Sequence, residues 1–287
     1  GYVLSNFSSV NKFELTYNGS VVGEDAPTGF QEAPMSPEIS KRVVGLEDGK
    51  LVIREDYLSQ QPETTGTESV TDASDPAINY DGTALACLGD TGRSLYFFSG
   101  GKGQYLVKNK KMTAPSFDSF GGAVRAYNAA STNEKERSKG IEIPVSWRSG
   151  MTFSSLRISH DGARVVVVGT RDGTAAVVMS GVVRDSSGTP KGFTEPVRVT
   201  SSITPRTAVW AGEQNLVVVN DKTGESEVTT LSGEETKFDR LDGVKSVSAA
   251  GNTSNMLAHR SDGSCYVLEE RGWNRLNTST REMSFAG

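Results

Sequence analysis

The sequence predicts an all-β protein, and more specifically a β-propeller, from its alternating pattern, a repeated hairpin and the spacing of that repeat. Short runs of apolar and β-branched residues alternate with Gly-containing turns along most of the chain. Within residues 156–168, two such runs flank Asp161-Gly162, which is a strong hairpin signal because the turn needs a positive φ angle. Residues 76–88 repeat this pattern around Asp81-Gly82. The hairpin is therefore a repeated unit of the fold.

The spacing of the repeat is that of a propeller blade. The first hairpin turns of successive units fall near residues 81, 120, 161, 212 and 251, at intervals of 39, 41, 51 and 39 residues. A period of about 40–45 residues with four short strands per unit is typical of propeller blades. The longest interval contains a hydrophilic insertion over residues 184–192.

The first residues differ from the rest of the chain. Phe13, Leu15 and Tyr17 alternate with polar residues, which predicts one strand of a hairpin. A stretch that contains several prolines follows and breaks the pattern. The sequence therefore predicts the end of a preceding domain plus a linker over residues 1–38, and the propeller over residues 39–287.

Five units each supply four predicted strands, counted from the innermost strand to the outermost. The predicted strands are 77–80, 84–88, 94–98 and 104–107, then 115–118, 123–129, 140–144 and 145–148, then 156–159, 164–168, 174–183 and 197–200, then 207–210, 216–220, 227–231 and 238–240, and finally 245–249, 255–258, 264–269 and 273–276.

Strands left over at both ends predict how the ring closes. Residues 42–46, 51–55 and 68–71 supply three strands of a blade that lacks its innermost strand, and residues 281–285 supply one unpaired strand. Pairing them gives a blade built from both ends of the chain and leaves no open sheet edge. The sequence thus predicts six four-stranded blades closed by pairing of N- and C-terminal strands, with five or seven blades as the alternatives.

Composition and charge exclude several classes of protein. With 36% hydrophobic residues, 31 Gly and a net charge of −5, the chain resembles neither a disordered segment nor a basic nucleic-acid-binding domain. No apolar run approaches the ~20 residues of a membrane-spanning helix. Cys87 and Cys265 lie in apolar runs that belong to non-adjacent units, so we expect buried free thiols, with a disulfide as the alternative.

Residue patterns of enzymes are missing from the sequence. Its two histidines, His160 and His259, each lie beside a predicted turn and have no metal-binding spacing. No G-x-S-x-G motif is present, and the Gly-rich residues 99–103 lie between strands. Most aspartates stand directly before or near a glycine, where Asp favours turn conformations. We therefore expect no catalytic residue, metal or cofactor, with a hydrolase or lyase as the remote alternative.

Charged residues concentrate at the second hairpin of each unit, which joins its second and third strands. All of these tips should fall on one face of the propeller, where a ring of mixed charge can orient a protein partner. Ordinary solvation of exposed turns is the alternative explanation. The candidate partner-binding residues are Asp48, Asp90, Arg93, Lys135, Arg137, Arg171, Asp172, Asp221, Lys222, Arg260 and Asp262.

Several segments together resemble a known family. These segments are S-L-R-I-S-H-D-G-A-R-V-V-V-V at 155–168, P-A-I-N-Y-D-G-T-A-L-A-C at 76–87, M-T-A-P-S-F-D at 112–118 and V-V-G-L-E-D-G-K-L at 43–51. They are similar to the propeller of the actinobacterial LpqB lipoproteins. F-E-L-T-Y-N-G-S-V-V at 13–22 resembles the end of the GerMN-type domain that precedes the propeller in that family. The family favours a Trp where Phe117 stands here.

The resemblance implies a place and a role for the protein. It implies an extracytoplasmic, lipid-anchored protein of the cell envelope, whose signal peptide and lipidated cysteine lie outside this chain. It also implies a non-enzymatic accessory of MtrAB-type two-component signalling, whose partner is the extracytoplasmic domain of an MtrB-type sensor histidine kinase. Binding of a small envelope ligand, such as a glycan or a peptide, in the central channel is the alternative function.

Overall fold

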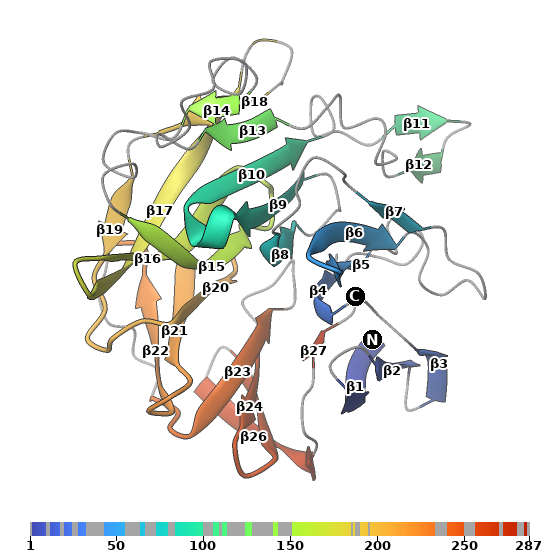
Figure 1. The fold of residues 1–287 in the computed structure, drawn as a ribbon. Coiled ribbons are helices and arrows are strands. Elements are labelled where there is room, and N and C mark those ends of the chain that lie inside the picture. Colours follow the sequence, from blue (N-terminus) through green and yellow to red (C-terminus); the bar gives the residue numbers. More distant parts are fainter. Residues whose placement is uncertain are drawn as a thin grey trace.

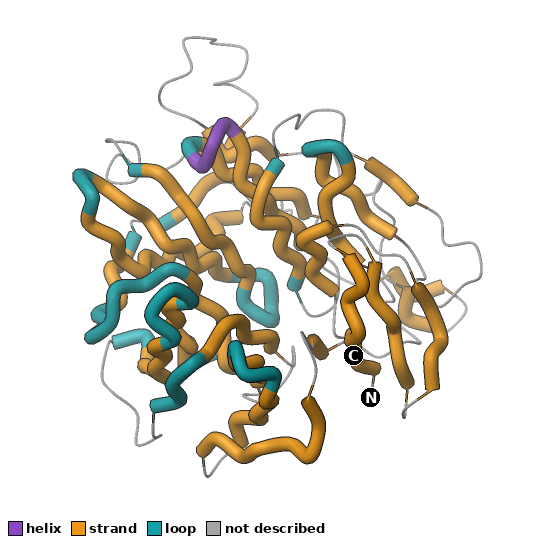
Figure 2. Tube along the Cα trace, turned by 60° about the horizontal axis from the view of Figure 1, so that its bottom comes forward, coloured by secondary structure: helices purple, strands orange, loops and turns teal. Residues whose placement is uncertain are grey.

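The chain folds into short β-strands that form meandering sheets arranged one after another around the molecule (Figure 1). Figure 2 shows the strands joined by loops and one single-turn helix, η1 (Asp90–Gly92). The computed structural model describes residues 2–9, 12–17, 20–24, 28–32, 43–54, 64–66, 73–79, 84–99, 106–108, 111–113, 124–127, 140–142, 151–184, 186, 190–194, 196–232, 240–249, 256–269, 272–279 and 284–285.

The two ends of the chain meet in one sheet. Its four strands, in spatial order, are β27 (Ser284–Phe285), β1 (Tyr2–Ser9), β2 (Lys12–Tyr17) and β3 (Ser20–Glu24). Val3 pairs with Phe285 and Leu4 pairs with Ser284, both in antiparallel register. Pairing of the N- and C-terminal strands is therefore confirmed.

The partner of the last strand differs from the prediction. We predicted that residues 281–285 complete the sheet of residues 42–46, but that place is taken by β4, within the predicted linker. The four strands of that sheet are β4 (Thr28–Glu32), β5 (Val43–Glu47), β6 (Lys50–Arg54) and β7 (Thr64–Gly66). Phe30 is the only large apolar residue of β4, so the strand gives no alternating signal in the sequence. The predicted strand 68–71 lies outside the described residues, and the division of the chain at residue 38 stays a prediction.

The largest sheet joins two meanders into ten strands. In spatial order its path runs through β15 (Thr152–Ile158), β16 (Arg164–Arg171), β17 (Thr174–Arg184), β18 (Pro190–Phe193), β14 (Gly140–Glu142), β13 (Val124–Tyr127), β10 (Ser94–Ser99), β9 (Ala84–Gly89) and β8 (Ser74–Ile78), while β19 (Val197–Val199) also pairs with β17. The eleven-residue β17 connects the meanders because its first half pairs with β19 and its last residues pair with β18.

The predicted unit over residues 115–148 is not a separate blade among the described residues. Its second strand, β13, pairs with β10 of the preceding unit, through Tyr96 and Arg125. Its third strand, β14, runs parallel to β13 instead of antiparallel. Residue pattern identifies a strand but does not say which free edge it joins, and the edge of β10 was free. Its other two predicted strands lie outside the described residues. Strand β11 (Leu106–Lys108), predicted as the outer strand beside β10, instead pairs with β12 (Lys111–Thr113).

Two further sheets match the predicted units closely. One contains β20 (Thr207–Ala211), β21 (Asn215–Asn220) and β22 (Glu225–Thr230), and the next contains β23 (Val244–Ala249), β24 (Met256–Arg260), β25 (Ser264–Glu269) and β26 (Gly272–Ser279). Of the predicted outer strand 238–240, only Arg240 is described, and it is not in a strand. The count of six blades stays a prediction.

The hydrophobic core fills the seams between neighbouring sheets. Strand β16 is buried on both faces, so its valines serve two clusters: Val165 and Val167 pack with Phe97 of β10, whereas Val166 and Val168 pack with Trp210 of β20. This division follows from the two-residue period of a strand. The unbroken apolar run of β16 is therefore typical of a strand between two packed sheets.

Candidate functional site

The second turns of three meanders lie against the first strand of the meander that follows, or against the residue just before that strand. The carbonyl of Gly49 accepts a hydrogen bond of 2.8 Å from the amide of Ala73, just before β8, and the carbonyl of Gly224 accepts one of 3.0 Å from the amide of Val244 in β23. Gly92 lies so close to β15 that a Cβ atom there would stand 2.2 Å from the carbonyl oxygen of Phe153. In an antiparallel meander the second turn lies at the same end as the start of the first strand. These contacts therefore place the turns on one face.

The predicted partner-binding residues differ in their exposure on these turns. Asp48 and Asp172 have left-handed backbone conformations, with φ angles of 49° and 50°, as the first residues of two-residue hairpin turns. Asp90 lies in η1, Arg171 and Arg260 are half-buried, and Lys135 and Arg137 lie outside the described residues. The exposed members of the set are Asp48, Arg93, Asp172, Asp221, Lys222 and Asp262.

Two of the predicted charges are held by neighbours on their own sheet. Arg260 lies over the ring of Tyr266, 5.6 Å from its centroid, and its Nη1 is 3.9 Å from Oδ2 of Asp262. Oδ1 of Asp262 accepts hydrogen bonds from the hydroxyl and the backbone amide of Ser264, which lower the pKa of this carboxyl. These contacts use part of the binding capacity of both charged groups.

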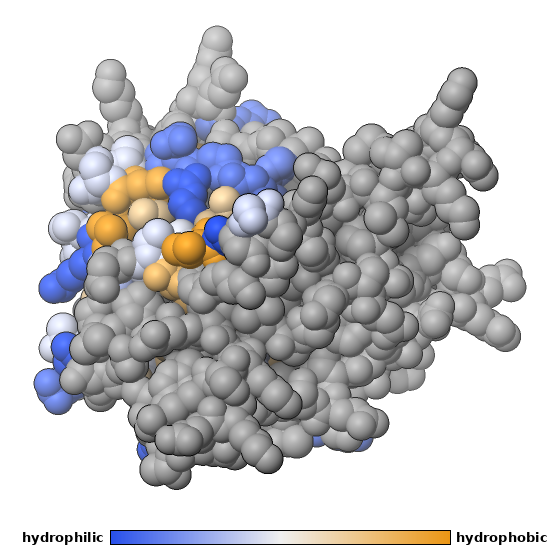
Figure 3. Space-filling model, turned by 90° about the horizontal axis from the view of Figure 1, so that it is seen from above, coloured by the Kyte–Doolittle hydropathy of each residue, from blue (hydrophilic) through white to orange (hydrophobic). Residues whose placement is uncertain are grey.

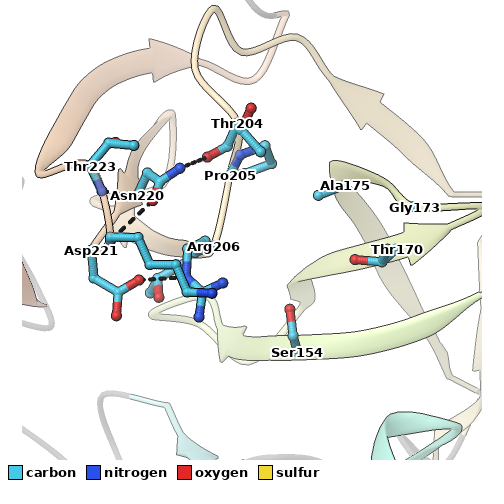
Figure 4. Close-up of a pocket in the computed structure, with 12 residues that line it drawn as sticks. Ser154, Thr170, Gly173, Ala175, Thr204, Pro205, Arg206, Asn220, Asp221 and Thr223 are labelled. Atoms are coloured by element: carbon cyan, nitrogen blue, oxygen red, sulfur yellow. Dashed lines mark hydrogen bonds and ion pairs between the residues drawn. The ribbon is translucent and has the colours of Figure 1, made fainter.

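A hollow of about 450 Å³ opens between the β15–β17 and β20–β22 strands (Figure 4). Figure 4 shows Ser154, Thr170 and Ala175 on one wall and Thr204, Arg206 and other polar residues on the opposite wall. Its full lining is Ser154, Thr170, Gly173, Ala175, Thr204, Pro205, Arg206, Thr207, Asn220, Asp221, Lys222 and Thr223. The hollow thus brings together two predicted residues, Asp221 and Lys222, with residues that the sequence did not single out.

Asn220, at the end of β21, shapes one wall of the hollow. Its Oδ1 accepts hydrogen bonds from the backbone amides of Lys222 and Thr223, at 3.1 and 3.3 Å, and its Nδ2 donates one of 3.0 Å to the carbonyl of Thr204. A short side-chain amide is suited to this role because it can mimic a backbone turn. Asn220 therefore fixes the second turn of its sheet against the segment before β20.

Arg206 is the main residue of the hollow that sequence reasoning missed. Its Nε donates to Oδ1 of Asp221 at 2.6 Å, and both side chains are nearly half exposed. The signal available in the sequence is the T-P-R-T segment at 204–207. It leads into the first predicted strand of the unit that follows the charged turn at 171–173. Such a segment is polar and rigid, but nothing in it indicates that it faces a turn across the hollow.

On the opposite ends of the same strands, Glu213 links two first turns. Its Oε2 accepts a 2.8 Å bond from Arg164, whose guanidinium also lies 5.0 Å from the centroid of the Trp210 ring. His160 Nδ1 lies 3.5 Å from Glu213 Oε1. His259 is buried in β24. His160 thus belongs to a first turn, whereas His259 pairs with Cys265 inside its sheet, next to the second turn that joins β24 and β25.

The carboxylate of Glu227 is buried and accepts hydrogen bonds from serine hydroxyl groups. Glu227 is only 5% exposed, and its oxygens accept from the hydroxyl groups of Ser201 and Ser202, both at 2.5 Å, and from the amide of Ser202 at 2.9 Å. Arg240 lies 3.6 Å from the same carboxylate. Full pairing of a buried carboxylate is typical of a structural group. The network ties residues 201–203 to β22.

Asp75 is a half-buried residue with an unusual backbone conformation. It lies where the pairing of β8 with β9 shifts register, and its φ angle is 47°. Burial raises the pKa of its carboxyl, and the positive charge of Arg157 lowers it by a smaller amount. A register shift of this kind re-aims a side chain within a sheet.

Other features limit the chemistry of the site. Cys87 and Cys265 are free and buried, and burial raises the pKa of the Cys87 thiol to about 12, so this thiol stays protonated. No group of three or more His, Cys, Asp or Glu suited to a metal ion occurs in the part of the chain that the structure describes. The described residues also include no helix long and apolar enough to cross a membrane.

The outer surface offers little contiguous apolar area in the described part. Seen from above, the described atoms form small hydrophobic patches bordered by hydrophilic ones (Figure 3). Val183 and Val197 are the large hydrophobic side chains that are exposed among the described residues. Contacts made by such a surface are mostly polar.

Comparison with known proteins confirms the fold and identifies a related family. A family model described as the lipoprotein LpqB beta-propeller domain matches residues 49–283. A chain from the crystal structure of a nidogen/laminin complex is similar over 100% of this chain and 98% of its own length, with a TM-score of 0.55 and 10% identity. The beta-propeller domain of Myceliophteria thermophila Cps50 (Swd1) is similar over 91% of this chain and 77% of its own, with a TM-score of 0.50 and 11% identity. No curated protein matches the chain. The chain is therefore an all-β propeller.

Proposed function

The chain belongs to the lipoprotein LpqB beta-propeller domain family, and on this basis we propose that it is a non-enzymatic, extracytoplasmic interaction module of a lipid-anchored cell-envelope protein. We further propose that its partner is the extracytoplasmic domain of an MtrB-type sensor histidine kinase, so that the module acts as an accessory of MtrAB-type signalling. Binding of a glycan or peptide in the central channel stays the alternative proposal.

One observation carries the proposal of protein docking. The second turns bear exposed charges of both signs, including Asp48, Arg93, Asp172 and Lys222, and hydrogen bonds or close packing fix three of these turns to the following meander. Charges on rigid turns lose little conformational freedom on binding and steer the encounter with a complementary surface. A face built in this way supports recognition of a polar protein surface.

Equilibrium binding to the kinase domain tests the proposal. We expect the domain to bind the extracytoplasmic domain of an MtrB-type kinase with a Kd in the micromolar range or tighter, on the order of −8 kcal/mol. Because screening weakens interactions between exposed charges, the Kd should rise when the salt concentration is increased from about 50 to about 500 mM. Absence of saturable binding at both salt concentrations would contradict the proposal.

Charge reversal locates the interface. The double variant Arg93→Glu/Lys222→Glu reverses two exposed charges on second turns, and we expect its Kd to be at least about tenfold higher. Arg198→Glu is the control because Arg198 is an exposed residue of β19, away from these turns. Unchanged affinity in the double variant, or an equal loss in the control, would place the interface elsewhere.

A further inference from the structure

The hollow between the β15–β17 and β20–β22 strands contains polar groups that the fold does not use. The ammonium group of Lys222 and the hydroxyl groups of Thr170 and Thr207 make no hydrogen bond or ion pair with other described residues, although all three residues line the hollow. By contrast, Asn220 bonds to the backbone of Thr204, Lys222 and Thr223, and Oδ1 of Asp221 accepts from Arg206. The unused groups are therefore those available to a ligand.

The second turn beside the hollow, between β16 and β17, differs from two other second turns. Gly92 is covered by Phe153 of β15, and Gly224 is covered by Gly243 just before β23, so that a Cβ atom there would meet backbone atoms at 2.2 and 2.8 Å. Gly173, at the turn between β16 and β17, has the same left-handed backbone with φ of 76°, yet no atom of the described residues lies within 4 Å of its Cβ position. The space beside the turn, which is filled at Gly92 and Gly224, is thus open at Gly173.

The open groups define the chemistry of a suitable ligand. An ammonium group has three donors and a positive charge, which suit a carboxylate or a phosphate. A threonine hydroxyl both donates and accepts, which suits the hydroxyl groups of a sugar. None of the described lining residues is aromatic, so hydrogen bonds and charge, rather than stacking, would provide the recognition. The volume of about 450 Å³ lies within the range of small-molecule sites.

We propose that this hollow binds a monosaccharide that carries a carboxylate or a phosphate group. Lys222 holds the anionic group, with Arg206 adding positive charge that Asp221 partly offsets. Thr170 and Thr207 approach the sugar hydroxyls from opposite walls. This binding site is separate from the proposed function, since it does not require a kinase partner.

Calorimetric titration with four probes tests the ligand class. The probes are glucuronate, glucose 6-phosphate, glucose and inorganic phosphate, and the first two distinguish a carboxylated from a phosphorylated sugar. We expect at least one of these two to bind saturably with a Kd below about 1 mM, and glucose and inorganic phosphate to bind at least tenfold more weakly. Lack of saturation by both anionic sugars at about 10 mM, or equal binding of inorganic phosphate, would overturn the proposal.

Variants locate the binding in the hollow. Lys222→Met should raise the Kd of the bound sugar at least about tenfold, and Thr170→Val should raise it at least about threefold. Arg198→Met removes an exposed charge outside the hollow and should leave the Kd unchanged. Thermal unfolding of each variant establishes that it is folded. Unchanged sugar binding in both hollow variants would overturn this placement, whatever the result with the kinase.

Discussion

Individual polar residues of this protein are fixed by partners that lie far away in the sequence. The sequence predicted correctly that Asp, Asn and Gly occupy the turns, because their preference for these conformations is local. It did not predict that Arg206 holds Asp221 or that Glu227 accepts from two serines, because these pairs form only when separate segments pack together. The charges of the candidate site were therefore visible in the sequence, but their availability was not.

Asp75 gives a prediction about the pH dependence of stability. Burial raises the pKa of its carboxyl above the ordinary value of 3.8, so the folded state binds this proton more tightly than the unfolded state. The free energy of unfolding should therefore fall as the pH rises from about 3.8 through the raised pKa. Asp75→Asn removes this loss and keeps a residue that tolerates a positive φ angle, so the variant should be more stable than the wild type above that window.

Urea unfolding as a function of pH checks this prediction. The difference in free energy of unfolding between Asp75→Asn and the wild type should disappear at low pH, where both side chains are neutral. Asp172→Asn is the matched control, because Asp172 has a φ angle of 50° but is exposed. A difference for Asp75→Asn that is the same at every pH would show that the carboxyl charge is not its cause.

At the scale of elements, turns and strands differ in how far neighbouring residues in the sequence determine their structure. The apolar run of β16 beside the Asp161-Gly162 turn predicted a strand, and burial on both faces explains why its valine run is unbroken. The short strands β4 and β13 were missed or given the wrong neighbour, since few apolar residues distinguish them. The hollow could not be predicted because it depends on whether a turn touches the next sheet.

Substitution of two turn glycines separates the destabilisation caused by backbone strain from the destabilisation caused by a steric clash with a neighbouring strand. Gly92→Ala and Gly173→Ala both place a side chain at a positive φ angle, of 83° and 76°, which costs about 1–2 kcal/mol. Gly92→Ala also drives a Cβ atom against the carbonyl of Phe153, which adds about 1–3 kcal/mol. We expect the free energy of unfolding to fall by about 3 kcal/mol for Gly92→Ala and by about 1 kcal/mol for Gly173→Ala. If chemical denaturation gave equal decreases in the free energy of unfolding for both variants, close packing of Gly92 against Phe153 would be contradicted.

At the scale of the whole molecule, the sequence predicted the fold class and the closing of the ring by its two ends. Both follow from counting repeats and from the rule that free sheet edges are avoided. The choice of closing partner was wrong, because β1, and not a strand of the β4–β7 sheet, is the strand beside β27. Edge pairing is a property of the assembled ring, so no local pattern determines it.

Removal of the last strand should weaken the whole ring. A chain that ends at residue 283 lacks β27, which pairs with β1 through Val3 and Leu4. The edge of β1 then has free hydrogen-bonding groups, and we expect the Tm to fall by at least about 4 °C, which corresponds to about 1–2 kcal/mol for a protein of this size. Calorimetry of the shortened and complete chains measures the change. An unchanged Tm would indicate that β27 does not stabilise the ring.

The bridge between the two meanders of the ten-stranded sheet has a consequence for the order of folding. Hairpins such as β15–β16 and β16–β17 join neighbouring residues, whereas the parallel pairing of Glu142 with Gly192 joins segments about fifty residues apart. Contacts between distant segments require more loop-closure entropy and form later. We therefore expect the individual hairpins to be protected early during refolding, and the β14–β18 bridge to form only after both meanders exist. Protection of the β14–β18 pairing during refolding would therefore indicate that both halves of the sheet have already folded.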